Sequence, residues 1–394
     1  MKISAFVATA VRCRMRFRTR RTSKLPRLHF GPSGAFFLLA FAVVGAAGEQ
    51  PESIAKLDLT RTVGTFGADS GVVFLTDDVL LISNGHSSPI SVVYDIPRKE
   101  IVRTGRMCGL TGKSVWATPG GMLLSDCYDG LVLYDLEFRQ IAKFQTRLDH
   151  YTIRNTLSLS PTHELVALSP FPKLGATTVL ATATLTEVHS FPSPSVGMLG
   201  LYKTGYTVAT YAKGMNEVEV SFYPFLGLQP ILLIKREKGC WWNTFGISES
   251  ELLKPCGEGG KGKVIDVNTA QNTLRIPDIE SAKFVQTSGS GKRFALGFQE
   301  YSKAHTIKQI INPFTYLLAL GTCCDDPSNL FRLRVYDQGS VGAVAEFHWK
   351  TNKNDPMWQR YDNSAVALSP SGEYVAFLRG TVVEVYRIQD SPSH

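Results

Sequence analysis

Cysteines are the residues whose number and positions most directly suggest chemistry in this sequence. The chain has seven, and Cys13 lies in an N-terminal segment that we expect to be removed. The other six are Cys108, Cys127, Cys240, Cys256, Cys323 and Cys324. An even number of cysteines in an exported protein is typical of disulfide bonds. Many pairings are possible, so the choice among them depends on the fold.

Motifs for catalysis or metal binding are missing from the sequence. We find no Gly-x-Ser-x-Gly motif and no pair of histidines with the spacing of metal ligands. GEGGKGK, from Gly257, resembles a phosphate-binding loop but lacks the Ser or Thr after lysine, so a flexible turn is the better interpretation. Asp77-Asp78 and Asp325-Asp326 are acidic pairs at turns, which are usually solvated. We therefore expect no cofactor and no metal.

The positive charge of the chain is concentrated at its N-terminus. The formal net charge is +8, but nine Lys and Arg residues and no Asp or Glu precede position 49. The rest of the chain has 33 basic and 34 acidic residues. It therefore lacks the excess of positive charge that phosphate binding requires, and we expect no nucleic-acid partner.

The basic segment continues into an uncharged apolar stretch, GAFFLLAFAVVGAAG, at residues 34–48. A basic start, a short apolar run and small residues at its end are the parts of a secretory signal. The apolar run has about 14 residues, and a permanent transmembrane helix needs about 20. We assign residues 1–48 as a basic leader and secretory signal cleaved near Ala47 or Gly48. The mature protein is then exported, periplasmic or extracellular; an uncleaved membrane anchor is the alternative.

Residues 49–390 contain a repeat that predicts the fold. SVWATPGGMLLSDCYDGLVLYDLEFRQIAKFQ, residues 114–145, reads as four short strands, rich in Val, Leu, Ile, Tyr and Phe and separated by turns. Similar units recur about every 40 residues, and there are seven in all. Four strands make one propeller blade, labelled a to d from the inside outward. The pattern predicts an all-β, seven-bladed β-propeller of four-stranded blades, followed by a polar tail at residues 391–394.

Aspartate recurs at the end of strand c, where its short side chain can accept a hydrogen bond from the backbone two residues on. The positions are Asp95, Asp135, Asp266 and Asp337.

The last unit ends after its third strand, at Arg387. A fourth strand is available at residues 53–62, SIAKLDLTRT, where apolar and polar residues alternate before the first complete unit. We expect this N-terminal strand to complete the last blade and close the ring, because pairing would cover two exposed sheet edges.

These residues carry a resemblance to a known superfamily. LSPTHELVAL, ALSPSGEYVAF and the Tyr-Asp pairs at Tyr94, Tyr134 and Tyr336 resemble the WD-repeat-like and quinoprotein-like β-propellers over residues 50–390. No unit has the Gly-His pair that the WD-repeat family places before strand a. The resemblance implies the propeller architecture and little about function.

The long connections of a propeller with this repeat fall on one face. The d–a and b–c connections emerge on that face, and the short a–b and c–d turns emerge on the other. The longest connections span residues 299–329 and 348–363. The first is too apolar for disorder and is either functional or a cover for the channel or an apolar patch.

Aromatic and charged residues in these connections are the candidate binding residues, since Trp, Tyr and Arg dominate interface energies. They are Trp358, Arg360, Tyr361, Trp241, Trp242, His150, Tyr151 and His86. Trp241 and Trp242 could instead pack under neighbouring blades.

The expected strand ends place four cysteines in pairs at the same face. We predict the disulfides Cys108–Cys127 and Cys240–Cys256. Cys323 and Cys324 could form a vicinal disulfide, bond to another chain or stay reduced.

A non-catalytic binding or scaffold protein is the function that these features favour, with a protein or extracellular polymer as partner and no membrane contact beyond the leader. The alternative is a propeller-type enzyme, such as a lactonase, a dehydrogenase subunit or a lyase. Its pocket would lie in the axial channel under residues 299–329, with Glu300, His305 and Asp325 as acid, base or ligand groups.

Overall fold

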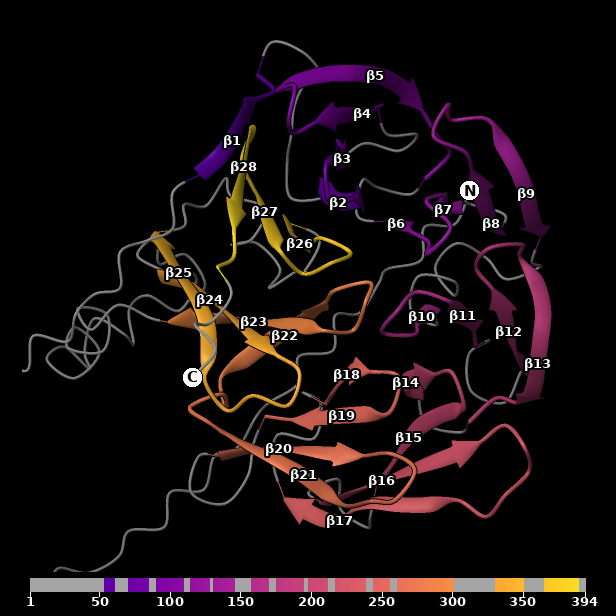
Figure 1. The fold of residues 1–394 in the computed structure, drawn as a ribbon. Helices are drawn as coiled ribbons and strands as arrows, with labels where there is room; N and C mark the ends of the chain where they lie inside the picture. Colours follow the sequence, from indigo (N-terminus) through magenta and orange to yellow (C-terminus); the bar gives the residue numbers. More distant parts are fainter. Residues whose placement is uncertain are drawn as a thin grey trace, which may run out of the picture. The chain divides into compact units, whose positions relative to one another are not determined.

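Seven four-stranded antiparallel sheets are arranged in a ring in the computed structural model (Figure 1). The structure describes residues 53–60, 70–84, 90–109, 114–127, 130–145, 157–169, 175–194, 198–211, 217–238, 244–255, 261–300, 330–350 and 365–389. The prediction of an all-β, seven-bladed β-propeller is confirmed. Among the described residues, no helix is long and apolar enough to cross a membrane.

Each of the first six blades is a continuous stretch of chain. Blade 1 comprises β2 (Gly71–Thr76), β3 (Val79–Ser83), β4 (Ile90–Asp95) and β5 (Glu100–Arg106); blade 2 comprises β6 (Val115–Ala117), β7 (Leu123–Cys127), β8 (Gly130–Tyr134) and β9 (Gln140–Gln145). Blade 3 comprises β10 (Leu157–Leu159), β11 (Leu165–Leu168), β12 (Ala176–Ala181) and β13 (Thr186–Pro192); blade 4 comprises β14 (Met198–Tyr202), β15 (Gly205–Tyr211), β16 (Glu217–Pro224) and β17 (Ile231–Lys238). Blade 5 comprises β18 (Phe245–Ser248), β19 (Glu251–Lys254), β20 (Lys261–Asp266) and β21 (Asn272–Pro277); blade 6 comprises β22 (Ala282–Thr287), β23 (Arg293–Glu300), β24 (Leu330–Asp337) and β25 (Ala343–Lys350).

Blade 7 combines the two ends of the described chain. Its strands a to c are β26 (Val366–Leu368), β27 (Tyr374–Arg379) and β28 (Val382–Arg387), and its outer strand is β1 (Ser53–Asp58). β1 runs antiparallel to β28, with Leu57 opposite Val383, and lies beside it in Figure 1. The amide of Leu59 extends the pairing by donating to the carbonyl oxygen of Thr381 at 2.8 Å.

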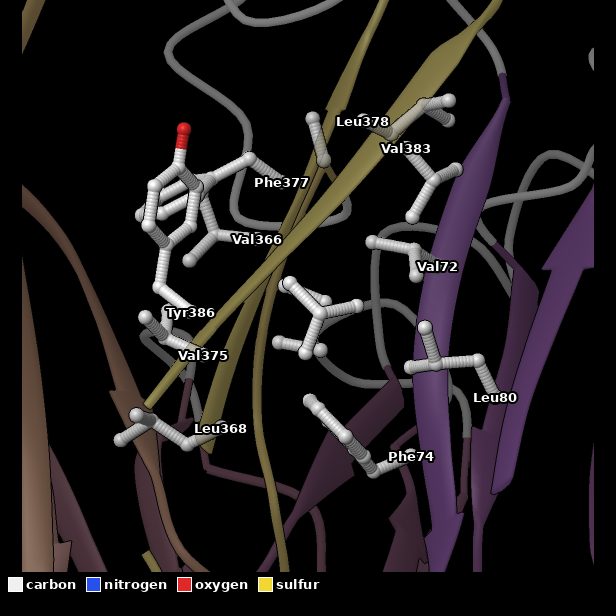
Figure 2. Packing of buried hydrophobic residues seen from close by; sticks show 14 of the residues in the cluster. Val72, Phe74, Leu80, Val366, Leu368, Val375, Phe377, Leu378, Val383 and Tyr386 are labelled. Carbon is white, nitrogen blue, oxygen red and sulfur yellow. The ribbon is translucent and has the colours of Figure 1, made fainter. Parts of the chain in front are cut away.

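The hydrophobic core lies between neighbouring blades. Middle strands are buried on both faces, as in the BBBBB pattern of β7, whereas the inner strand β10 is half-buried throughout and the outer strand β5 is mostly exposed. The largest cluster joins blades 6, 7 and 1. In Figure 2, Val72 of blade 1 lies near Val383 of blade 7. Burial between blades on both sides explains why the middle strands read as nearly continuous apolar runs.

The two faces of the ring differ in how the strands are joined. We call the face with the a–b and c–d turns the turn face, and the face with the b–c and d–a connections the connection face. On the turn face, adjacent strands are joined by short, fully described turns, such as the two residues between β2 and β3. On the connection face, residues 301–329 join β23 to β24, and residues 351–365 join β25 to β26.

Three a–b turns share one hydrogen-bonding motif. A buried serine directly follows strand a, and its hydroxyl oxygen accepts the backbone N–H of the residue five positions later: Ser160 from Leu165, Ser288 from Arg293, and Ser369 from Tyr374. The third residue after each serine has positive φ. These bonds satisfy backbone groups at the inner end of each blade and fix the turn that borders the channel.

Candidate functional site

The sequence-predicted binding residues lie in the connections. Those outside the described residues are Trp358, Arg360, Tyr361, Trp241, Trp242, His150, Tyr151, His86, His305 and Asp325. Glu300 is the last residue of β23, and its backbone lies opposite Leu330 of β24. The ends of β23, β24 and β25 therefore place the start and finish of residues 301–329, and the start of residues 351–365, on the connection face.

Cys108 and Cys127 lie at disulfide distance, as the predicted pairing requires. Their Cα atoms are 5.5 Å apart, within the normal range for a disulfide. Two side chains of blade 2 hold Cys108 in place: the Tyr134 hydroxyl accepts the Cys108 N–H at 3.0 Å, and the Ser125 hydroxyl donates to its carbonyl at 2.7 Å. The bond ties the connection before strand a of blade 2 to the end of its strand b. Cys240, Cys256, Cys323 and Cys324 lie outside the described residues.

A cavity of about 760 Å³ occupies the central channel. Residues of all seven inner strands line it. Each inner strand is the edge strand of its sheet, so its second row of backbone N–H and C=O groups is not used in sheet pairing. The wall of the channel therefore carries neutral backbone donors and acceptors on every side.

The turn between β10 and β11 lies across the turn-face end of this channel. We call residues 160–164 the plug. The Thr287 hydroxyl of blade 6 donates to the carbonyl oxygen of Pro161 at 2.6 Å, although blades 3 and 6 are not neighbours in the ring. Pro161 also lies against blade 5, where a Cβ added at Gly246 would be 3.1 Å from its Cγ. The plug thus spans the channel instead of lying at its rim.

Glu249, in the a–b turn of blade 5, fastens the plug. Its Oε1 accepts the Thr162 N–H at 3.0 Å and the Thr162 hydroxyl proton, and its Oε2 accepts the Lys203 N–H at 2.7 Å. One carboxylate therefore links the turns of blades 3, 4 and 5 through charge-assisted hydrogen bonds.

His163 is the most unusual residue of the plug, and the sequence analysis did not select it. Its φ is 59°, in a region that non-glycine residues rarely adopt, while the equivalent residues of the sibling turns are Gly291 and Gly372. Its Nδ1 lies 3.1 Å from the carbonyl oxygen of Ala117 in blade 2. Burial lowers the pKa of His163, opposed by that contact and by Glu249. A histidine in the glycine position of this repeated turn was the signal that could have identified it.

Two threonine hydroxyls in the channel wall lack hydrogen-bond partners among the described residues. Thr118 is 5% exposed and Thr244 is 8% exposed, and both line the cavity. Thr118 occupies the position of the motif serines, but its hydroxyl does not make their bond. An unpaired buried hydroxyl costs free energy unless water or a ligand pairs with it.

The described channel wall offers few groups for acid–base chemistry. Its titratable side chains are Asp77 and His163. Asp77 accepts the N–H of Ser371 at 2.9 Å, which joins the turns of blades 1 and 7. The described residues contain no group of three or more metal-ligating side chains that could hold a metal ion.

The arrangement of this wall is therefore suited to binding a neutral ligand. Comparison of the chain with protein-family models and with curated proteins found no match.

Proposed function

We propose that this protein is an exported, non-catalytic binding protein that holds a protein or extracellular polymer on its connection face. The observation that carries the proposal is the difference between the two faces. The turn face is tied together by short turns and by the hydrogen bonds of the plug, whereas the longest connections all leave from strand ends on the opposite face.

Blade 6 gives these connections a rigid base. β23, β24 and β25 are each eight residues long, and both the 301–329 and the 351–365 connections leave from this blade. The ring of Trp349 packs 4.8 Å from that of Phe331 and 4.4 Å from that of Phe377 in blade 7. A binding segment held on ordered strands loses less entropy when it binds a partner.

Charged side chains reinforce the same blade. Glu346 pairs with Arg334 at 3.0 Å and with His348 at 2.9 Å. The Arg332 guanidinium lies 4.8 Å from the ring centre of Phe298. These contacts join strands β23, β24 and β25 across their width, which supports a scaffold role for blade 6.

Trp358, Arg360 and Tyr361 supply the partner contacts in this proposal, because they belong to the connection that leaves from β25 and are of the types that dominate interface energies. The leader at residues 1–48 directs export, which places the propeller where disulfides such as Cys108–Cys127 persist. The WD-repeat-like relationship suggested by the Ser-Pro and Tyr-Asp positions fits a binding role as well.

Comparative pull-down tests the proposal. Wild-type protein, Trp358→Ala and Arg360→Ala would each be immobilised and exposed to extracts of the source cells. Leu226→Ala and Arg98→Ala are matched controls, because these side chains are exposed on the turn face. Loss of a partner with the first pair but not with the controls supports the proposal. Equal recovery by all variants, or loss only with the turn-face controls, contradicts it.

A further inference from the structure

At the turn-face end of the central channel, the plug lies across the opening. The plug contacts Ala117 in blade 2, Glu249 in blade 5 and Thr287 in blade 6. These contacts reach three sides of the ring. Entry of a ligand from the turn face into the cavity of about 760 Å³ would therefore require the plug to move.

The wall of this cavity is rich in neutral hydrogen-bonding groups. Besides the edges of seven inner strands, the lining residues include the polar residues Thr118, Ser158, Thr244 and Gln286. Among the described lining residues, Asp77 is the one acidic residue, and no Lys or Arg is present. Such a wall offers no counter-charge to an anionic ligand and many partners to a neutral one.

The unpaired hydroxyls of Thr118 and Thr244 point to a ligand independently of the strand edges. Both threonines are more than nine-tenths buried, and neither hydroxyl oxygen has a partner among the described residues. Thr118 follows β6 at the turn-face end of the channel, and Thr244 precedes β18 at the connection-face end. Buried hydroxyls without a partner in the described part of the chain thus lie near both ends of one cavity.

We propose that the channel is a one-ended socket for a neutral, hydroxyl-rich molecule, such as a short oligosaccharide or the end of a longer one. Its hydroxyl groups would pair with the strand edges and with Thr118 and Thr244, while the plug sets the depth. The volume lies within the range of pockets that bind small molecules. The socket adds a small-ligand site to the proposed function, and its occupancy does not depend on Trp358 or Arg360.

Saturation-transfer NMR with sugars of one size tests this assignment. The probes are maltotriose, cellotriose and mannotriose, with trigalacturonate as the anionic control. Wild-type protein is compared with Thr244→Val and Thr118→Val, which replace each hydroxyl by a methyl group of similar size. A third variant, Ser158→Phe, adds volume from strand β10. Thermal unfolding of each variant checks that it folds.

The expected result is binding of at least one neutral trisaccharide and none of trigalacturonate. Each Thr→Val change should weaken that binding about five- to tenfold without lowering the melting temperature, because it removes one hydrogen bond to the ligand and one unpaired buried group. Trp358→Ala should bind the same sugar normally, which separates failure of the socket from failure of the partner site.

Three results would overturn the proposal. The first is no detectable binding of any neutral probe at a concentration of about 10 mM, which exceeds the dissociation constant of a weak specific complex. The second is equal binding of trigalacturonate. The third is wild-type affinity in both Thr→Val variants.

Discussion

Lys56 of β1 and Glu384 of β28 lie directly opposite each other in the outermost strand pair of blade 7, and their side chains form an ion pair at 3.3 Å. Arg379 of β27 also contacts the Glu384 carboxylate. Side chains from β1 and β27 therefore both contact the buried carboxylate of Glu384. These ion pairs add to the backbone hydrogen bonds that hold β1 against β28.

Acid should weaken this closure. Burial raises the pKa of Glu384, but Arg379 and Lys56 outweigh it and lower the pKa below its usual value of 4.5. A carboxyl with a lowered folded pKa contributes stability that is present above the unfolded pKa and is lost as pH falls through the folded pKa. Glu384→Gln should cost about 2 kcal/mol of unfolding free energy at pH 7, the scale of a charged hydrogen bond.

Urea unfolding of wild type and Glu384→Gln at several pH values measures this effect. The difference between them should shrink as pH falls below 4.5. Lys56→Gln is the control, and it should cost under about 1 kcal/mol because the Lys56 side chain is exposed. A Glu384→Gln effect that does not change with pH would rule out the ion pair as its cause.

Loosening the plug should destabilise the turn face locally. Glu249→Gln removes the charge and one acceptor from a group that receives bonds from Thr162 and Lys203. We expect a loss of about 1.5 kcal/mol and faster amide exchange at residues 160–164. Glu164→Gln, at an exposed pair with Lys203, is the control and should change stability by less than about 1 kcal/mol. Unchanged exchange in Glu249→Gln would mean that the carboxylate does not hold the plug.

Glycine should be better than alanine at position 163. The φ of 59° costs an L-residue about 1 kcal/mol, and glycine avoids that cost. The free energy of unfolding of His163→Gly should therefore be higher than that of His163→Ala by about this amount. His189, in strand β13, serves as the control, since glycine in a strand is less stable than alanine. If the glycine variant were less stable than the alanine variant at both positions, the backbone strain at position 163 would be disproved.

The Cys108–Cys127 bond closes a loop with a sequence separation of 19. Replacing both cysteines by alanine should lower stability by about 3 kcal/mol, because the unfolded chain regains the entropy of that loop. Peptide mapping of the unreduced protein would identify the linked fragments. A free thiol at Cys108 in protein purified without reductant would refute the pairing.

The blade pattern was readable from the sequence because each turn is a local event. Asp135 and Asp266 accept the N–H of the residue two positions later, as the sequence analysis expected. Asp337 instead pairs with Arg293 at 2.6 Å, and Arg293 also donates to the carbonyl of Gly372 in blade 7. That partner is 44 residues away in the chain, so only the fold could reveal it.

The channel site was harder to foresee. The plug works through bonds between blades far apart in sequence, such as that of Thr287 to Pro161, separated by 126 residues. The hydroxyls of Thr118 and Thr244 were selected because they are buried and have no hydrogen-bond partner among the residues that the structure describes, a property that no local sequence pattern encodes. The candidates in the connections remain predictions.

Closure of the ring by β1 underlies the assignment of every connection to a face, and amide exchange tests it most directly. The measurement is native-state hydrogen exchange of the purified protein. The amide of Leu59, which donates to Thr381, should exchange about as slowly as amides within β28. Exchange of Leu59 at the rate of an unstructured peptide, with β28 still protected, would contradict the closed ring.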